Sequence, residues 1–382
     1  MASKSSIYLD NAASAPLRVE VLAAMNEAGR AEFANPSSSH GAGRKAAACV
    51  DDARQRLLVA LGLDDSWRVL FTSGGTEADA LAVIGRTALV VDRTRKQAAA
   101  PTVVTTVIEH PAVLGCRSIL SRMGAHLEIV ESDRDGHVPP AALAEAVSPH
   151  TAVLSVMHVN NELGTVQDVD SAAKLARLKN PEIMIHSDAV QSLGMLGIDT
   201  LASSVDCMSL SAHKIGGPRG VGALVLRRGI ELAPLTGGGD QEEGLRPGTE
   251  NLVGIVGFAR AVELCRHDDS GRILGLTERL QSGIERRIDG VQFHGRVLSG
   301  HILALSIQGI GSDVLVRALS DRGVYVSSGS ACHSTRKSHV AKILGLGPNW
   351  GTIRFSLSWQ TTQDDVDQAL DVLCAVVRDF RV

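Results

Sequence analysis

Between about Arg44 and Leu226, continuous apolar runs alternate with segments whose apolar residues recur at helical spacing. The runs AVLSVMHV (152–159) and EIMIHSD (182–188) contain consecutive apolar residues rather than an apolar residue at every second position. Strands that are apolar on both faces are typical of a parallel sheet covered by helices on both sides. The pattern therefore predicts an α/β fold built from right-handed βαβ crossovers. In such folds, ligands bind beyond the carboxyl ends of the strands.

The same patterns place the individual elements. Helices are expected at 46–61, 78–89, 113–123, 258–265, 273–288, 313–321 and 364–380. Strands are expected at 69–72, 103–108, 152–159, 182–188, 207–210 and 301–308, with a further strand ending near Val326.

The arrangement changes after Gly254, where two predicted helices are followed by a strand, a helix and a short strand. We interpret this part, together with the N-terminal segment, as a smaller α/β domain. The expected division is a large domain, residues 16–255, and a small domain made of residues 1–15 and 256–382.

Composition narrows the class of protein. The 382 residues are 44% apolar and 21% charged, with a net charge of −4 and scattered basic residues. Nucleic acid or an anionic membrane would require a concentrated basic face, so neither is an expected partner. The first residues have no long apolar run, so no signal peptide is expected, and no apolar run reaches the roughly 18 residues of a membrane span. Six widely spaced cysteines without a Cys-x-x-Cys pair favour a reducing cytoplasm and argue against a zinc site.

Polar residues gather where predicted strands end. TSGGTEAD (72–79) follows one strand and precedes a helix, so that Gly75 and Thr76 are suited to contact a phosphate. An ordinary capped turn is the alternative for this motif. In SAHK (211–214), Ser211, His213 and Lys214 follow the strand at 207–210. A desolvated lysine has a lowered pKa, which suits a Schiff base, whereas a solvated turn lysine is the plainer alternative.

Three further motifs follow other strands. HSDAVQS places Asp188 at a strand end, with Gln191 one helical turn later. The carboxylate of Asp188 is suited to pair with a cation such as a protonated pyridinium, and the alternative is that Asp188 caps the N-terminus of a helix. NNELG contributes Asn161, and EHPAV contributes His110, although a single histidine is more often structural. Cys332 lies in the polar, glycine-containing SSGSACHS segment, so it is the cysteine most suited to ionise.

These motifs together resemble the cysteine desulfurases of the IscS and NifS type, in the class V aminotransferase group of fold-type I enzymes. The resemblance extends from YLDNAAS near the start to IRFSL near the end. It includes, in the family's order, TSGGTEAD, EHPAVL, NNELGTVQD, HSDAVQS, SAHK, GGG…LRPGTEN and SSGSAC.

The resemblance implies pyridoxal 5'-phosphate as cofactor, held by the large domain, and a homodimer. Lys214 would carry the cofactor, Asp188 would face its ring nitrogen, and Gln191 and Asn161 its ring hydroxyl, while His110 would stack on the ring. Gly75, Thr76, Ser211 and His213 would bind the phosphate, with Thr249 added from the other subunit. Asn35, Asn161 and Arg354 would hold the carboxylate of L-cysteine, and Cys332, in the small domain, would take the sulfur as a persulfide.

The expected activity is therefore PLP-dependent desulfuration of L-cysteine, which yields L-alanine and passes sulfur to an acceptor protein, for iron–sulfur clusters or another sulfur product. Selenocysteine lyase, another class V reaction and a non-catalytic sulfur-transfer subunit are the alternatives. The acidic segment Asp240–Glu243 departs from the family pattern. It is expected to point into solvent or to pair with basic residues.

Overall fold

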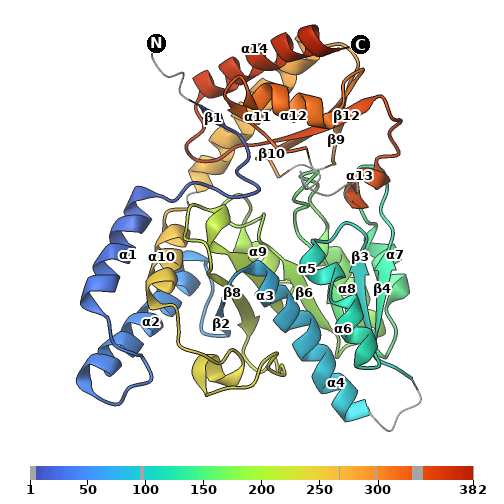
Figure 1. Ribbon diagram of the computed structural model, residues 1–382. Coiled ribbons are helices and arrows are strands. Elements are labelled where there is room, and N and C mark those ends of the chain that lie inside the picture. Colours follow the sequence, from blue (N-terminus) through green and yellow to red (C-terminus); the bar gives the residue numbers. More distant parts are fainter. Residues whose placement is uncertain (1–5, 95–98, 266, 297–298, 329–338, 382) are drawn as a thin grey trace.

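The structure, a computed structural model, describes residues 6–94, 99–265, 267–296, 299–328 and 339–381. A seven-stranded sheet with the order β2-β8-β7-β6-β5-β3-β4 forms the centre of the larger, lower part in Figure 1. Its strands, in chain order, are β2 (Trp67–Thr72), β3 (Thr102–Thr106), β4 (His126–Val130), β5 (Thr151–Ser155), β6 (Met184–Asp188), β7 (Cys207–Ser211) and β8 (Gly222–Arg227).

Every residue of β5, β6 and β7 is buried, as expected for strands covered on both faces. Neighbouring strands are parallel except at β8, which is antiparallel to both β2 and β7. The uninterrupted series of crossovers predicted up to Leu226 is therefore wrong at its last step. The glycine-rich connection 212–221 is too short for a crossover helix, so the chain turns back beside β7.

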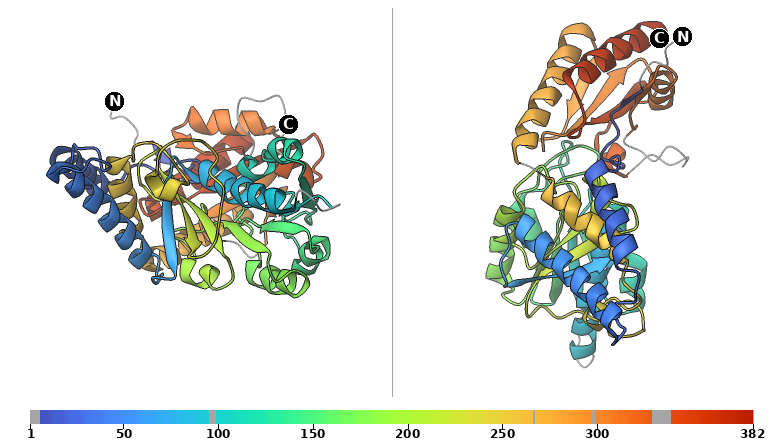
Figure 2. Two further views of the ribbon diagram at one scale, coloured as in Figure 1. Left: turned by 90° about the horizontal axis from the view of Figure 1, so that it is seen from below. Right: turned by 90° about the vertical axis from the view of Figure 1, so that its left-hand side faces the viewer.

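Because β8 reverses direction between them, β2 and β7 run the same way, and β2, β3, β5, β6 and β7 all end at one edge of the sheet. Helices cover both faces (Figure 2). Helices α1 and α2 pack against α10 on one flank. The helices of this part are α1 (Val19–Ala31), α2 (Gly41–Ala60), α3 (Gly75–Ala80), η1 (Leu81–Gly85), α4 (Arg86–Thr94), α5 (Pro111–Leu114), α6 (Arg117–Arg122), α7 (Pro140–Ala146), α8 (Val169–Lys179), α9 (Ile198–Ala202), η2 (Ala212–Lys214), η3 (Gln241–Gly244) and α10 (Leu252–Glu263).

Two predicted helices contain breaks. The helix expected at 78–89 runs from α3 through the π turn η1 into α4, and all five residues of that turn are buried. The helix expected at 113–123 is divided into α5 and α6 at Gly115 and Cys116.

The upper part of Figure 1 has its own sheet and its own core. Strands β12, β10 and β9 form an antiparallel sheet, and β1 pairs in parallel with β11. The buried side chains of Leu9, Leu305, Phe355 and Leu373 belong to this core. The elements here are β1 (Ile7–Tyr8), α11 (His267–Arg287), β9 (Val291–His294), β10 (Ile302–Gln308), α12 (Ser312–Ser320), β11 (Val324–Tyr325), α13 (His339–Ile343), β12 (Trp350–Ser356) and α14 (Gln363–Phe380).

The hydrophobic pattern did not predict β1, β4, β8, β9 or β12. Strand β4 lies at the sheet edge and is only partly buried, so its sequence HLEIV alternates weakly. Within the described ranges, the structure contains no helix with the length and apolar character that a membrane crossing requires.

Candidate active site

A cavity of about 210 Å³ opens at the edge of the sheet where the parallel strands end. We call it the Lys214 cavity. Its polar lining comes from the segments that follow β2, β3, β5, β6 and β7, which is why residues far apart in the sequence meet here. The predicted cofactor residues that line it are Gly75, Thr76, His110, Asn161, Asp188, Gln191, Ser211, His213 and Lys214.

Lys214 ends the short helix η2, directly after β7. Its Nζ donates hydrogen bonds to the carbonyl oxygens of Ala12 (2.6 Å) and Ala13 (2.9 Å). Burial lowers the pKa of Lys214 to about 8, and the positive charge of Arg354 acts in the same direction. An appreciable fraction of this amine is therefore unprotonated near neutral pH, the form that attacks an aldehyde.

Asp188, at the end of β6, is buried, and its Oδ1 accepts a hydrogen bond of 2.9 Å from the amide of Val190. Burial raises the pKa of Asp188, whereas the charges of His110 and Lys214 act to lower it. A cation placed beside this carboxylate would offset the cost of burying it.

The same lining includes Thr76, Ser211 and His213, which carry two hydroxyls and an imidazole. Burial lowers the pKa of His213 to about 4, so its ring is neutral and carries one N–H donor. At Gly75, an added Cβ would lie 2.8 Å from Cγ2 of Val190, so a side chain here would crowd the lining. A small polar anion suits this set of donors.

The lining fits pyridoxal phosphate: an amine for its aldehyde, a carboxylate for its ring nitrogen and neutral donors for its phosphate. His110 Nδ1 accepts a hydrogen bond of 3.1 Å from the amide of Ala112 and caps α5. In a neutral ring the proton is then on Nε2.

Arg354, on β12, is 5% exposed and lies between the two parts of the molecule. Its Nη1 donates to the carbonyl of Asn161 (2.6 Å), and its Nη2 lies 2.7 Å from Asp10 Oδ1. Among the described residues, its buried Nε has no hydrogen-bond partner. An unused donor on a fixed guanidinium is suited to a carboxylate. Asp10, in YLDNAAS, was not predicted as a site residue.

Four predicted residues are not part of this lining. Arg354 lies beside it and contacts Asn161, which does line it. Asn35 and Thr249 are exposed and do not line the Lys214 cavity. Cys332 lies in 329–338, outside the described residues. Burial raises the pKa of each of the other cysteines, to about 11 for Cys116 and Cys265. None of those described thiols is suited to be a nucleophile at neutral pH.

Near Asp188 are two ionisable groups that the sequence did not indicate, and one of them, Asp79, also lines the Lys214 cavity. Asp79 is buried with its Oδ1 3.5 Å from His186 Nε2, and burial raises the pKa of Asp79 well above its usual range. Burial likewise raises the pKa of Glu109 to about 8; its Oε1 accepts from Thr106 Oγ1 and the amide of Met157. Asp79 is within TSGGTEAD and Glu109 precedes His110, so the motifs contained these residues without revealing their roles.

The acidic segment is anchored rather than free. Glu242 is buried and accepts from both Arg54 Nη atoms (2.9 and 3.1 Å) and from the amide of Phe71 on β2 (2.9 Å). Glu243 pairs with Arg68. Both glutamates adopt positive φ, 46° and 60°, a region that favours glycine. Of the two outcomes expected for this segment, pairing with basic residues holds for Glu242 and Glu243, whereas Asp240 is exposed.

Residues 7–369 match the family described as aminotransferase class V. A curated cysteine desulfurase of Cereibacter sphaeroides is 40% identical over 382 residues, which cover 98% of this chain and 96% of the relative. A solved structure titled NifS-like protein has a TM-score of 0.88 at 33% identity and covers 98% of this chain and 100% of its own. A structure of SspA in complex with cysteine has a TM-score of 0.78 at 31% identity, covering 94% and 100%.

Proposed function

The chain belongs to the class V aminotransferase family and is a pyridoxal phosphate-dependent cysteine desulfurase, and we propose which of its residues remove sulfur from L-cysteine. The observation that carries the proposal is that Lys214, with its lowered pKa, and the buried Asp188 line one cavity. The structural likeness to a protein solved with cysteine supports L-cysteine as the substrate.

Lys214 would attach the cofactor, Asp188 would pair with its ring nitrogen, and Gly75, Thr76, Ser211 and His213 would hold its phosphate. When bound, pyridoxal phosphate supplies an electron sink that stabilises negative charge at the substrate Cα. The carboxylate of Asp188 favours the protonated ring nitrogen that this chemistry requires.

Once displaced by substrate, the Lys214 amine would act as the base that takes the Cα proton. A pKa of about 8 suits this role near neutral pH. The carbonyl oxygens of Ala12 and Ala13 accept from Nζ and would hold the ammonium group formed by the proton transfer.

Arg354 would bind the substrate carboxylate from beside the Lys214 cavity, where it contacts the lining residue Asn161. Asp10 and the carbonyl of Asn161 fix the guanidinium plane from two sides, which reduces the entropy lost on binding. Asn35 is proposed to contact the same carboxylate only on the ground of the family resemblance, since it does not line the cavity.

The Cys332 thiolate would attack the substrate sulfur. An S–S bond forms to Cys332, and the substrate C–S bond breaks with its electron pair remaining on carbon. Protonation of that carbon gives L-alanine, and the outer sulfur remains on Cys332 as a persulfide. An acceptor protein would then remove it.

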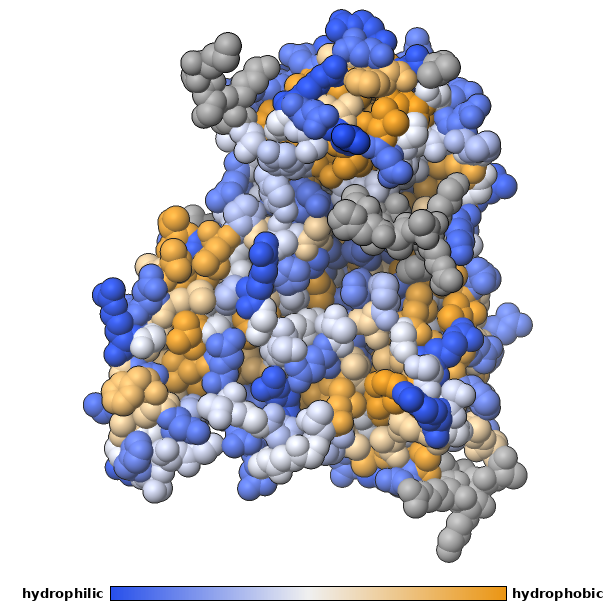
Figure 3. All heavy atoms as spheres, viewed as in Figure 1, coloured by the Kyte–Doolittle hydropathy of each residue, from blue (hydrophilic) through white to orange (hydrophobic). Residues whose placement is uncertain are grey.

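We also propose a homodimer in which Thr249 reaches the partner's phosphate site. Thr249 is exposed and lies outside its own cavity lining, as such a role requires. Val19 and Leu22 on α1 are large, exposed apolar side chains, and Figure 3 shows hydrophobic surface over the side that carries this helix. A second copy is the occupant that we propose for this surface. The wide cysteine spacing supports a reducing compartment such as the cytoplasm.

The decisive experiment supplies purified protein with pyridoxal phosphate, L-cysteine and dithiothreitol and quantifies alanine and sulfide. Equal amounts of both products without a keto acid are expected. A requirement for a keto acid would indicate an aminotransferase, turnover of selenocysteine alone a lyase for that substrate, and no product a non-catalytic subunit. Borohydride reduction and peptide mapping should place the pyridoxyl group on Lys214; labelling of another lysine would contradict the site.

A further inference from the structure

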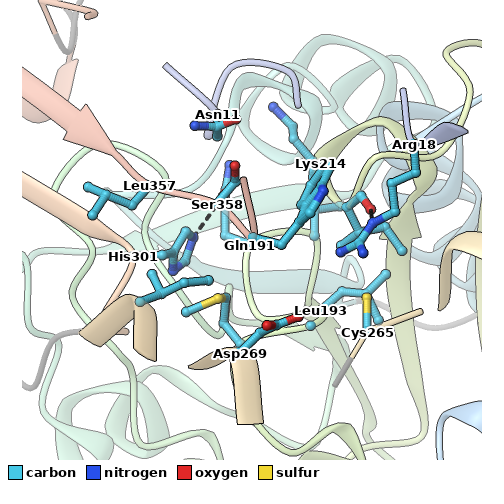
Figure 4. A pocket seen from close by; sticks show the side chains of 16 residues that line it. Asn11, Arg18, Gln191, Leu193, Lys214, Cys265, Asp269, His301, Leu357 and Ser358 are labelled. Atoms are coloured by element: carbon cyan, nitrogen blue, oxygen red, sulfur yellow. Dashed lines mark hydrogen bonds between the residues drawn. The ribbon is translucent and has the colours of Figure 1, made fainter. Parts of the chain in front are cut away.

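A second cavity, of about 40 Å³, lies on the other side of Lys214 and Gln191 and extends toward the upper part of the molecule (Figure 4). We call it the His301 cavity. His301, next to the first residue of β10, lines it and is 6% exposed. Gln191 lines both the His301 cavity and the Lys214 cavity, so it separates them. His301, beside the three-stranded sheet β12-β10-β9 (the small sheet), thus lies directly behind the predicted cofactor residue Gln191.

One series of hydrogen bonds joins these groups. His301 Nδ1 lies 3.0 Å from Ser299 Oγ, and His301 Nε2 lies 3.3 Å from Gln191 Oε1, a contact drawn in Figure 4. Gln191 Nε2 donates to the carbonyl of Ala12 at 2.9 Å. Lys214 Nζ donates to the same carbonyl.

The direction of each hydrogen bond follows from Ala12. A backbone carbonyl only accepts, so the NH₂ group of Gln191 must face it, and Oε1 must face His301. His301 Nε2 must therefore carry a proton. If the amide were flipped, two oxygens would face each other in a buried site, which is costly.

The state of the imidazole agrees with this assignment. Burial lowers the pKa of His301 to about 4. A hydrogen bond to the backbone of Ser299 acts to raise this pKa, and the positive charge of Arg354 acts to lower it. The ring is therefore neutral near pH 7. With its proton on Nε2, Nδ1 accepts from the Ser299 hydroxyl. The other ionisable groups that line the His301 cavity are Arg18, Lys214, Cys265 and Asp269.

We propose that His301 is a positioning residue that locks the Gln191 amide, so that Gln191 presents its NH₂ group and never its carbonyl to the ring oxygen of the cofactor. This rests on the proposed function and on the role that the family resemblance implies for Gln191, which would face the ring hydroxyl of the cofactor. One NH₂ hydrogen is used by Ala12, and the second remains for the Lys214 cavity. A fixed donor stabilises the deprotonated form of a ring oxygen. The small sheet thereby influences the cofactor through a single side chain.

The test compares the absorbance of the bound cofactor between pH 6 and pH 10 in wild type and variants. His301→Leu removes the N–H group that donates to Gln191 Oε1. The pH at the midpoint of the absorbance change, which reports deprotonation of the cofactor, should then rise by about half a unit or more, the size expected for one weakened hydrogen bond. His301→Gln has an amide donor of similar reach and should restore the wild-type midpoint. The matched control is His294→Leu, because His294 is a buried histidine of the same part that bonds Ser306 Oγ and does not line either cavity.

An unchanged midpoint in His301→Leu, or an equal shift in His294→Leu, would overturn the proposal. A second test measures thermal unfolding of the cofactor-free protein and does not depend on the proposed function. The losses of thermal midpoint in His301→Leu and Gln191→Leu should be less than additive in the double variant, because the two share one interaction. Additive losses would overturn the His301–Gln191 coupling. Wild-type protein that takes up no cofactor would instead contradict the proposed function alone.

Discussion

Asp10 Oδ1 lies 2.7 Å from Arg354 Nη2, and this ion pair joins the N-terminal segment to β12 beside the Lys214 cavity. Both residues approach the cavity from the upper part of the molecule, whereas the predicted cofactor residues that line it come from the large sheet. The group proposed to bind substrate is therefore held by a different set of elements from the groups proposed to bind cofactor.

Arg354→Lys should raise KM for L-cysteine by about tenfold or more and change kcat much less. Lysine keeps the charge but not the paired donors that match a carboxylate. Initial rates of alanine formation measure both constants. Arg279→Lys is the control, because Arg279 lies on the surface and donates from Nε and Nη2 to the two carboxylate oxygens of Asp367. An unchanged KM would remove Arg354 from the substrate site.

Cys332→Ser should keep the cofactor absorbance and its response to L-cysteine but lose sulfide release by a factor of about 100 or more, since serine lacks a thiolate nucleophile. Cys374→Ser, a substitution at a partly buried thiol on α14, should retain activity. Normal sulfide release by Cys332→Ser would show that another cysteine does the work.

Thr249→Ala should weaken retention of the cofactor during dialysis several-fold while the protein sediments as a dimer. The substitution removes one of several donors to the phosphate but leaves the proposed dimer surface unchanged. Thr200→Ala, at an exposed position on α9, is the control. A fully loaded, active monomer would refute the shared site.

Glu109→Gln should stabilise the protein increasingly as pH rises. The pKa of Glu109 is raised to about 8, so between 4.5 and 8 the folded state holds a proton that the unfolded state releases. That stabilisation is complete below pH 4.5 and is lost as pH rises through 8. Glutamine has no such dependence, so its relative stability gains up to about 1.4 kcal/mol per pH unit over this range.

Urea midpoints at pH 5, 6.5 and 8 measure this trend. Glu263→Gln is the contrast, because its hydrogen bond to Arg56 lowers the pKa of Glu263 and its effect should be constant over the same range. A constant difference for Glu109→Gln would mean that Glu109 is ionised throughout.

The sequence predicted the lining of the Lys214 cavity well because parallel strands bring their carboxyl ends to one edge. The apolar runs located the strands, and the polar residues just after them had to meet there; Asp188 and Lys214 are examples. Thr249 and Asn35 are different, since no strand end fixes their place. Their roles stay predictions.

His301 and Asp10 could not be predicted in this way. His301 precedes the apolar strand β10 and resembles a structural histidine until its contact with Gln191 is known. The partner of Asp10 is 344 positions away. Pairing between such distant residues is set by tertiary packing, which hydrophobic periodicity does not encode.

The domain division remains a proposal. The buried residues of α10 belong to the core of the large sheet, although the predicted boundary at 255/256 falls inside this helix. We propose that the larger unit extends through α10 to Cys265, because this helix packs against α1 and α2.

The contact of the N-terminal segment with β12 has a consequence for the order in which the chain folds during synthesis. Asn11 donates to the carbonyl of Ser356, 345 positions later, and the neighbouring Ala12 supplies the carbonyl that Lys214 and Gln191 share. The large sheet can form while synthesis continues, but this N-terminal segment can take its place only after β12 has emerged. Lys214 is therefore synthesised well before the carbonyl groups that it contacts are held in position, so a nascent chain should acquire a competent site only once β12 has left the ribosome.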